Sequence, residues 1–201
     1  MSMKLILASS SPRRAEILRD AGFVFEVCAP EIDEARRPQE AAGKMVARLA
    51  ESKARAAAEL AVAKNPALII GADTAVEVDG EIFGKPRDAA DAREMLSCLS
   101  GRTHSVLTGI HVLRLPDGAT RSAIETTAVT FARLEQKEID AYVASGEPFD
   151  KAGGYAIQGG AGRYIPRIEG CYFNVVGLPL ARLNALLGEL GRRQGGPRLE
   201  N

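Results

Sequence analysis

The segment from Ala67 to Val78 places the strongest constraint on how this chain can fold. Its first half is almost wholly apolar, which predicts a buried strand. Asp79-Gly80 follows and favours a hairpin, so Glu81 to Phe83 should return antiparallel beside it. A long helical pattern, from about Gln39 to Ala63, precedes the strand. A chain that combines hairpins with strand–helix connections requires a mixed sheet.

The remaining periodicities predict strands and helices on both sides of this segment. Strands are expected at residues 4–8, 23–28, 103–113, 119–131, 164–169 and 172–176, and helices at 12–20, 88–101, 135–144 and 179–190. The expected fold class is therefore α/β, with a mixed, elongated central sheet flanked by helices. Residues 1–190 should form a single domain, and residues 191–201 have the composition of a disordered tail.

Composition excludes several classes of protein. Of the 201 residues, 46% are hydrophobic and 26% are charged, which is typical of a globular domain. The 26 basic and 26 acidic side chains balance, so nucleic acid is not an expected partner. The three cysteines are far apart and form no CxxC pair, which favours a reducing compartment. No apolar run could span a membrane and no signal peptide is evident, so a cytoplasmic location is expected.

The sequence also argues against two common kinds of hydrolase. Its only histidines, His104 and His111, lie in a predicted strand, so a histidine-rich metal site is excluded. No G-x-S-x-G nucleophile elbow occurs, which argues against a Ser-His-Asp hydrolase.

Asp73 is the most informative single residue. It follows five residues of a strand that should be buried, and an unpaired buried carboxylate is costly. A metal ion or a catalytic water is one natural partner, and a backbone N–H at the strand end is the alternative. Thr74 adds a second polar group at the same place, which favours a functional site.

Basic residues occur at three positions where they could bind an anion. Ser9 and Arg13 belong to a serine-rich turn that opens a helix, and a helix N-terminus attracts anions. Lys53 falls on the apolar face of the long helix, where it either points into a site or extends to the surface. Lys85 follows the hairpin in a Gly-Lys-Pro-Arg turn. Each of these residues could instead be an ordinary solvated cation.

Two loops offer further polar groups. Glu31, Asp33 and Glu34 form an acidic cluster, and Mg²⁺ prefers such oxygen ligands, although most acidic loops are only solvated. The glycine-rich stretch from Lys151 to Gly159 contains Gln158, whose amide can both donate to and accept from the edge of a nucleobase. A flexible loop around a packed tyrosine is the alternative interpretation.

In this order, the segments resemble the Maf family of nucleoside triphosphate pyrophosphatases. The resemblance spans residues 4 to about 190, and the ordered set is far more specific than any one segment. The matching segments are Leu7–Arg14, Glu51–Ala54, Gly71–Thr74, Gly84–Arg87, Leu99–Gly101, Ala152–Gly159 and Asn174–Pro179.

The resemblance implies two lobes with a cleft between them, hydrolysis between the α and β phosphates of a nucleoside triphosphate, a divalent cation (Mg²⁺ or Mn²⁺) and a homodimer. It also implies roles for individual residues. Asp73 would accept the proton of the attacking water, and Glu34 would bind the metal together with Asp73. Arg13, Lys53 and Lys85 would hold phosphates, with Ser9 beside them.

Within the family, the subgroup that acts on dTTP and UTP carries an Ile-Gln-Gly element, as Ile157-Gln158-Gly159 does here. Arg13, Thr74 and Gln158 match the positions associated with substrate choice. The resemblance therefore implies dTTP and UTP as substrates. The same reaction on 7-methyl-GTP or a non-standard purine, and a non-enzymatic nucleotide-binding regulator of cell division, are the alternatives.

Overall fold

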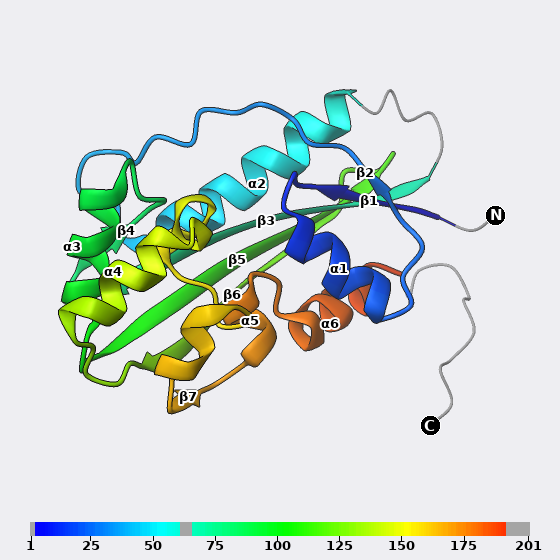
Figure 1. Ribbon diagram of the computed structural model, residues 1–201. Coiled ribbons are helices and arrows are strands. Elements are labelled where there is room, and N and C mark those ends of the chain that lie inside the picture. Colours follow the sequence, from blue (N-terminus) through cyan, green and yellow to red (C-terminus); the bar gives the residue numbers. More distant parts are fainter. Residues whose placement is uncertain (1–2, 61–65, 192–201) are drawn as a thin grey trace.

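The computed structural model describes residues 3–60 and 66–191, which form one mixed seven-stranded sheet (Figure 1). The strand order is β2-β1-β3-β5-β6-β7, and β4 pairs with β3. β1 is parallel to both β2 and β3, whereas the other pairs are antiparallel. The predicted mixed sheet is therefore confirmed. The strands are β1 (Lys4–Ala8), β2 (Glu26–Val27), β3 (Ala67–Val78), β4 (Glu81–Phe83), β5 (Thr103–Leu115), β6 (Thr120–Thr130) and β7 (Arg167–Glu169).

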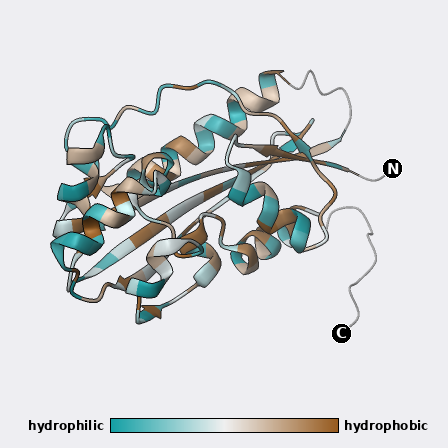
Figure 2. Ribbon diagram, viewed as in Figure 1, coloured by the Kyte–Doolittle hydropathy of each residue, from teal (hydrophilic) through white to brown (hydrophobic). Residues whose placement is uncertain are grey.

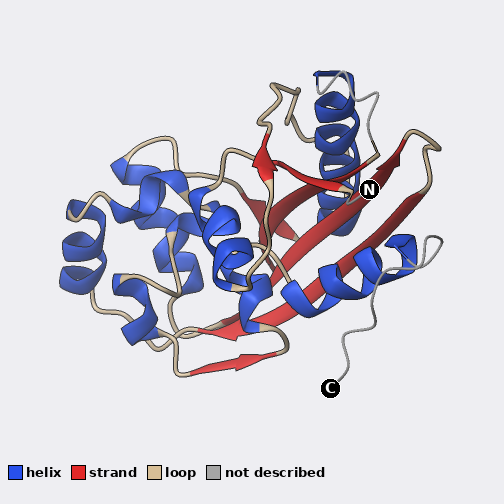
Figure 3. Cartoon of the chain, turned by 90° about the vertical axis from the view of Figure 1, so that its right-hand side faces the viewer, coloured by secondary structure: helices blue, strands red, loops and turns tan. Residues whose placement is uncertain are grey.

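Helices cover both faces of this sheet (Figure 3). α2 packs on one face, and α1 and α6 pack on the other. Hydrophobic residues recur along the helices and the central strands (Figure 2), and the buried ones form the apolar core. The helices are α1 (Pro12–Asp20), α2 (Ala42–Leu60), α3 (Ala89–Leu99), α4 (Gln136–Ala144), α5 (Tyr172–Val176) and α6 (Leu180–Gly191), with 3-10 turns η1 (Glu147–Asp150), η2 (Ala152–Gly154) and η3 (Gly160–Tyr164).

The apolar core is divided between the two ends of the long strands. At one end, β1 and the first half of β3 are buried between α2 on one side and α1 with α6 on the other. At the other end, α3, α4 and the 3-10 turns pack around the ends of β3, β5 and β6. The sheet thus connects two lobes, as the fold class predicted.

Helix α2 approaches the sheet unusually closely because two strand residues have no side chain. A Cβ atom at Gly71 would lie 2.0 Å from the Ala50 carbonyl oxygen, and one at Gly109 would lie 2.4 Å from the Val46 carbonyl oxygen. The helix backbone therefore rests directly on β3 and β5. Because Lys53 belongs to α2, this contact also fixes the distance of Lys53 from the sheet.

The strand predicted at residues 172–176 is wrong, because the structure has helix α5 there. The Asn174 amide points inward and donates to the Val106 carbonyl and to the Thr127 hydroxyl, both at 2.9 Å. The helix ends at Gly177, whose φ of +126° disfavours other residues. These buried hydrogen bonds outweigh the β propensity of the aromatic and β-branched residues in the segment.

Smaller differences concern the ends of elements. Only Glu26–Val27 of the predicted strand 23–28 pairs with a neighbour, and only Arg167–Glu169 of the strand predicted at 164–169 does so. α6 continues through Gly191, which was assigned to the tail, and residues 192–201 lie outside the described residues. The end of the long helix predicted to reach Ala63 also lies outside them.

None of the helices in the described part of the chain is long and apolar enough to cross a membrane. The three cysteines, Cys28, Cys98 and Cys171, are all free.

Candidate functional site

A gap in the pairing of strand β3 creates the site. β1 pairs with β3 as far as Gly71, and β4 pairs with the same edge of β3 from Val76 onward. Between these points, no described strand pairs with this edge, and Asp73 lies in the gap. The chain leaves β1 at Ser9 and leaves β4 at Gly84, so both exits converge on Asp73. Polar side chains from several segments can therefore surround Asp73 at this point of the sheet.

On one face of β3, Asp73 contacts the lysine of α2. Strand alternation turns Asp73 toward the same face as Gly71, where α2 packs closely. The Lys53 ammonium lies 2.6 Å from an Asp73 carboxylate oxygen and 2.9 Å from the Glu34 carboxylate. Asp73 and Lys53 are only 8% and 9% exposed. Lys53 thus points into the site rather than to the surface, and it connects two acidic residues of separate segments.

On the opposite face, Thr74 contacts a buried arginine of α1. Arg14 donates to the Ser9 hydroxyl at 3.1 Å, to the Thr74 hydroxyl at 3.0 Å and to the Gly177 carbonyl at 2.8 Å. Burial lowers the pKa of the Arg14 guanidinium, and the nearby Asp73 carboxylate opposes that shift. Arg14 remains a cation, because guanidinium groups stay protonated in proteins. Both arginines of this first turn were candidates for anion binding from the sequence, but only Arg13 was assigned to the predicted site.

All eight residues predicted for the site line one pocket of about 630 Å³. They are Ser9, Arg13, Glu34, Lys53, Asp73, Thr74, Lys85 and Gln158. Among the lining residues that the structure describes, six cations outnumber three carboxylates: Arg13, Arg14, Arg36, Lys53, Lys85 and Lys151 against Glu34, Asp73 and Asp150. The pocket is therefore suited to an anionic ligand with several negative charges.

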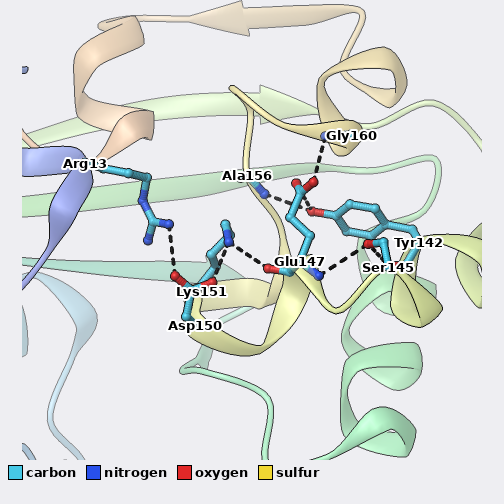
Figure 4. Close-up of polar contacts among 8 residues, drawn as sticks. All are labelled: Arg13, Tyr142, Ser145, Glu147, Asp150, Lys151, Ala156 and Gly160. Atoms are coloured by element: carbon cyan, nitrogen blue, oxygen red, sulfur yellow. Dashed lines mark hydrogen bonds and ion pairs between the residues drawn. The ribbon is translucent and has the colours of Figure 1, made fainter. Parts of the chain in front are cut away.

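An ion pair crosses the pocket between the two lobes (Figure 4). Arg13 of α1 lies 3.3 Å from the Asp150 carboxylate of η1, and Lys151 pairs with the same carboxylate. Neither Asp150 nor Lys151 was predicted as a site residue. The signal was their position in the sequence: Asp150 directly precedes the glycine-rich stretch and Lys151 is its first residue, and this stretch lines the same pocket.

The acidic loop contributes one carboxylate rather than three. Glu34 lines the pocket, whereas Glu31 does not, and Asp33 instead accepts a hydrogen bond from the Ala35 N–H at 2.9 Å. No group of three or more potential metal ligands occurs within residues 3–60 and 66–191. The pair of Glu34 and Asp73 nevertheless fits Mg²⁺, which typically binds one or two carboxylates and completes its shell with substrate phosphates and water.

Gln158 extends from the loop between η2 and η3 on the far side of the pocket. The residue is exposed, and its amide has no hydrogen-bond partner within the described part of the chain. The amide is therefore free to donate to and accept from a ligand.

Comparison with known proteins identifies the family. The model of the Maf-like protein family matches residues 4–190. A relative from Citrifermentans bemidjiense, named dTTP/UTP pyrophosphatase, is 52% identical over 188 residues, which cover 93% of this chain and 95% of the relative. A relative of the same name from Vibrio cholerae is 50% identical over 184 residues, covering 92% of this chain and 96% of the relative.

A crystal structure of a nucleoside-triphosphatase (dITP/XTP pyrophosphatase) from Mycobacterium abscessus aligns with 66% of this chain and 76% of its own. The sequence identity is 19% and the TM-score is 0.39, which is too remote to bear on function. The family model and the two close relatives are sufficient by themselves: this chain belongs to the Maf family.

Proposed function

We propose that this protein hydrolyses dTTP and UTP to the nucleoside monophosphate and pyrophosphate. The observation that carries the proposal is the meeting of the buried Asp73 carboxylate with a ring of cations in a single pocket. A triphosphate is polyanionic, so these cations offset its charge while a carboxylate handles the proton of water. The relatives that share about half of the sequence are named dTTP/UTP pyrophosphatases, which supports the choice of bases.

In this mechanism the carboxylate and the cations of the pocket have different tasks. Asp73 accepts the proton of the attacking water, as a positioned general base does. Arg13, Lys53 and Lys85 hold the phosphates and stabilise the charge that develops on them. Arg14 donates hydrogen bonds to both Ser9 and Thr74, so it holds these hydroxyls in place in the lining of the pocket.

We further propose that Glu34 and Asp73 hold a divalent cation, Mg²⁺ or Mn²⁺, together with the substrate. Their carboxylates already share one cation, the Lys53 ammonium, so they lie close enough to act on a common charge. A bound divalent cation would neutralise phosphate charge during hydrolysis.

Removal of divalent cations is therefore expected to abolish hydrolysis of UTP. Activity should return on addition of Mg²⁺ or Mn²⁺, because oxygen ligands favour hard cations. The measurement is pyrophosphate release in the presence of excess chelator, before and after titration with each metal. Glu34→Gln should raise the metal concentration needed for half-maximal rate. Undiminished activity in excess chelator would contradict the role of the metal.

Base selection should depend on Gln158. The Watson–Crick edge of uracil or thymine presents acceptor, donor and acceptor, which a Gln amide can pair with. We expect UTP and dTTP to be hydrolysed well ahead of CTP, ATP and GTP, because a mismatched base leaves polar groups of the base and of the Gln158 amide unpaired in the complex. Gln158→Ala should narrow the gap between UTP and CTP without abolishing turnover. The measurement is initial pyrophosphate release across the nucleotide panel for both proteins.

The same panel separates the alternatives. A preference for 7-methyl-GTP or a non-standard purine would keep the reaction but change the subgroup. Binding of nucleotides without pyrophosphate release would favour a regulator, although binding alone does not require a buried carboxylate beside a lysine. A homodimer and a cytoplasmic location remain predictions.

A further inference from the structure

The loop that carries Gln158 has to be held in place by something other than Gln158 itself. Residues between η2 and η3 belong to no strand or α-helix, and the Gln158 amide has no hydrogen-bond partner in the described residues. The position of a side chain that selects a base has to be fixed to within a fraction of an ångström. The glycines around it give the backbone no stiffness of their own.

Two residues of the same lobe, one in α4 and one in η1, fix this loop on both sides of Gln158 (Figure 4). The Ala156 N–H donates to the Tyr142 hydroxyl at 3.2 Å. The Gly160 N–H donates to the Glu147 carboxylate at 3.0 Å. The Tyr142 hydroxyl in turn donates to the other Glu147 oxygen at 2.7 Å. Tyr142 and Glu147 thus form one unit that binds the backbone before and after the predicted base-reading side chain.

Both members of this unit are themselves well fixed. Tyr142 is 3% exposed, because α4 packs its ring into the apolar core of that lobe. Burial raises the pKa of the Tyr142 phenol, and the hydrogen bond to Glu147 raises it further, so the hydroxyl stays protonated and keeps donating. Glu147 opens η1, the turn that also supplies Asp150 to the pocket.

Close packing adds a steric constraint to the hydrogen bonds. A Cβ atom at Gly159 would lie 2.1 Å from a Glu147 carboxylate oxygen. Because that carboxylate is held by Tyr142 and by the Gly160 N–H, it cannot move aside without breaking both bonds. Gly159 therefore allows the loop to lie directly on Glu147.

We propose that Tyr142 and Glu147 are positioning residues for base discrimination, which fix the loop so that Gln158 meets the edge of a pyrimidine. The inference rests on the proposed function and extends it to residues that do not touch the substrate. It predicts that the two residues affect selectivity through Gln158 and by no other route.

The test compares the ratio of kcat/KM for UTP to that for CTP in a set of variants. Tyr142→Phe removes only the hydroxyl, and Glu147→Gln keeps the size of the side chain. In each variant the ratio should fall by about tenfold, the scale of a lost hydrogen-bond network. The fall should come mainly from a higher KM for UTP rather than a lower kcat. Gly159→Ala should act in the same direction, since its Cβ displaces the Glu147 carboxylate.

Ser145→Ala is the matched control. Its hydroxyl donates to the Tyr142 carbonyl and accepts from the Glu147 N–H, and within the described residues it makes no hydrogen bond to the loop. The ratio should be unchanged in this variant. If Tyr142→Phe does not fold, as judged by thermal melting, Glu147→Gln and Gly159→Ala still decide the matter.

A double-mutant cycle distinguishes positioning from a general structural role. In the Gln158→Ala background, Tyr142→Phe and Glu147→Gln should lower the ratio no further. A ratio within about twofold of wild type in all three loop variants, or the same fall with and without Gln158, would overturn the inference while leaving the proposed function intact. A wild-type protein that does not prefer UTP over CTP overturns the proposed function and this inference together.

Discussion

Asp73→Asn is expected to lower kcat for UTP by about 10²-fold or more, the scale of general-base catalysis. The amide keeps the shape of the side chain but cannot accept a proton from water. The fold should survive, because Lys53 retains its ion pair with Glu34. The measurement is steady-state pyrophosphate release together with a thermal melt of the same sample.

Asp79→Asn is the matched control for this variant. The residue occupies the exposed β3–β4 turn with a φ of +51°, a conformation that asparagine tolerates, and its carboxylate pairs with Arg102 away from the pocket. Loss of this negative charge should leave turnover unchanged. Near-wild-type kcat in a folded Asp73→Asn protein would remove Asp73 from the role of base.

Gly71→Ala is expected to have the largest effect on stability, a loss of about 3 kcal/mol or more in the free energy of unfolding. The added Cβ would lie 2.0 Å from the Ala50 carbonyl oxygen and 2.9 Å from the Ala54 nitrogen. Both atoms are backbone, so the whole of α2 has to move away from the sheet. Because α2 carries Lys53, the variant should also weaken the Lys53–Asp73 contact and lower activity.

Gly188→Ala provides a control of opposite sign. Gly188 lies inside α6, and among the described residues no atom outside the helix's own backbone lies within 4 Å of a Cβ built there. Alanine in a helix interior should stabilise the protein by about 0.5–1 kcal/mol relative to glycine. Thermal or denaturant melts of both variants make the comparison. Equal effects of the two substitutions would contradict close packing of α2 at Gly71.

Much of the fold could be predicted from local patterns in the sequence. The apolar run of β3 and the turn at Asp79-Gly80 specify a hairpin by themselves, and Asp88 caps α3 by accepting hydrogen bonds from two backbone N–H groups of its first turn. α5 could not be predicted in this way. Its helical form depends on hydrogen bonds from Asn174 to Val106 and Thr127, which are distant in the sequence.

Part of the site could be predicted because two charged residues stand at positions where the sequence pattern predicts buried apolar residues. These residues are Asp73, in a buried strand, and Lys53, on the apolar face of a helix. The structure brings both into the pocket. Asp150 could not be predicted in this way, because an acidic residue before a glycine-rich loop is usually only solvated. Its proximity to Arg13 arises only when the two lobes come together.

The excess of cations in the pocket has a consequence for the kinetics of ligand capture. The chain as a whole carries 26 positive and 26 negative side chains, so the pocket's charge is balanced elsewhere on the molecule. Beyond a Debye length of about 8 Å at physiological ionic strength, an approaching anion encounters almost no net attraction. A polymer such as RNA needs a row of exposed cations to associate. A single nucleotide, in contrast, can diffuse to within a Debye length of the pocket and then interact with all of its cations. The encounter rate should therefore be set by diffusion into the pocket mouth and depend weakly on salt.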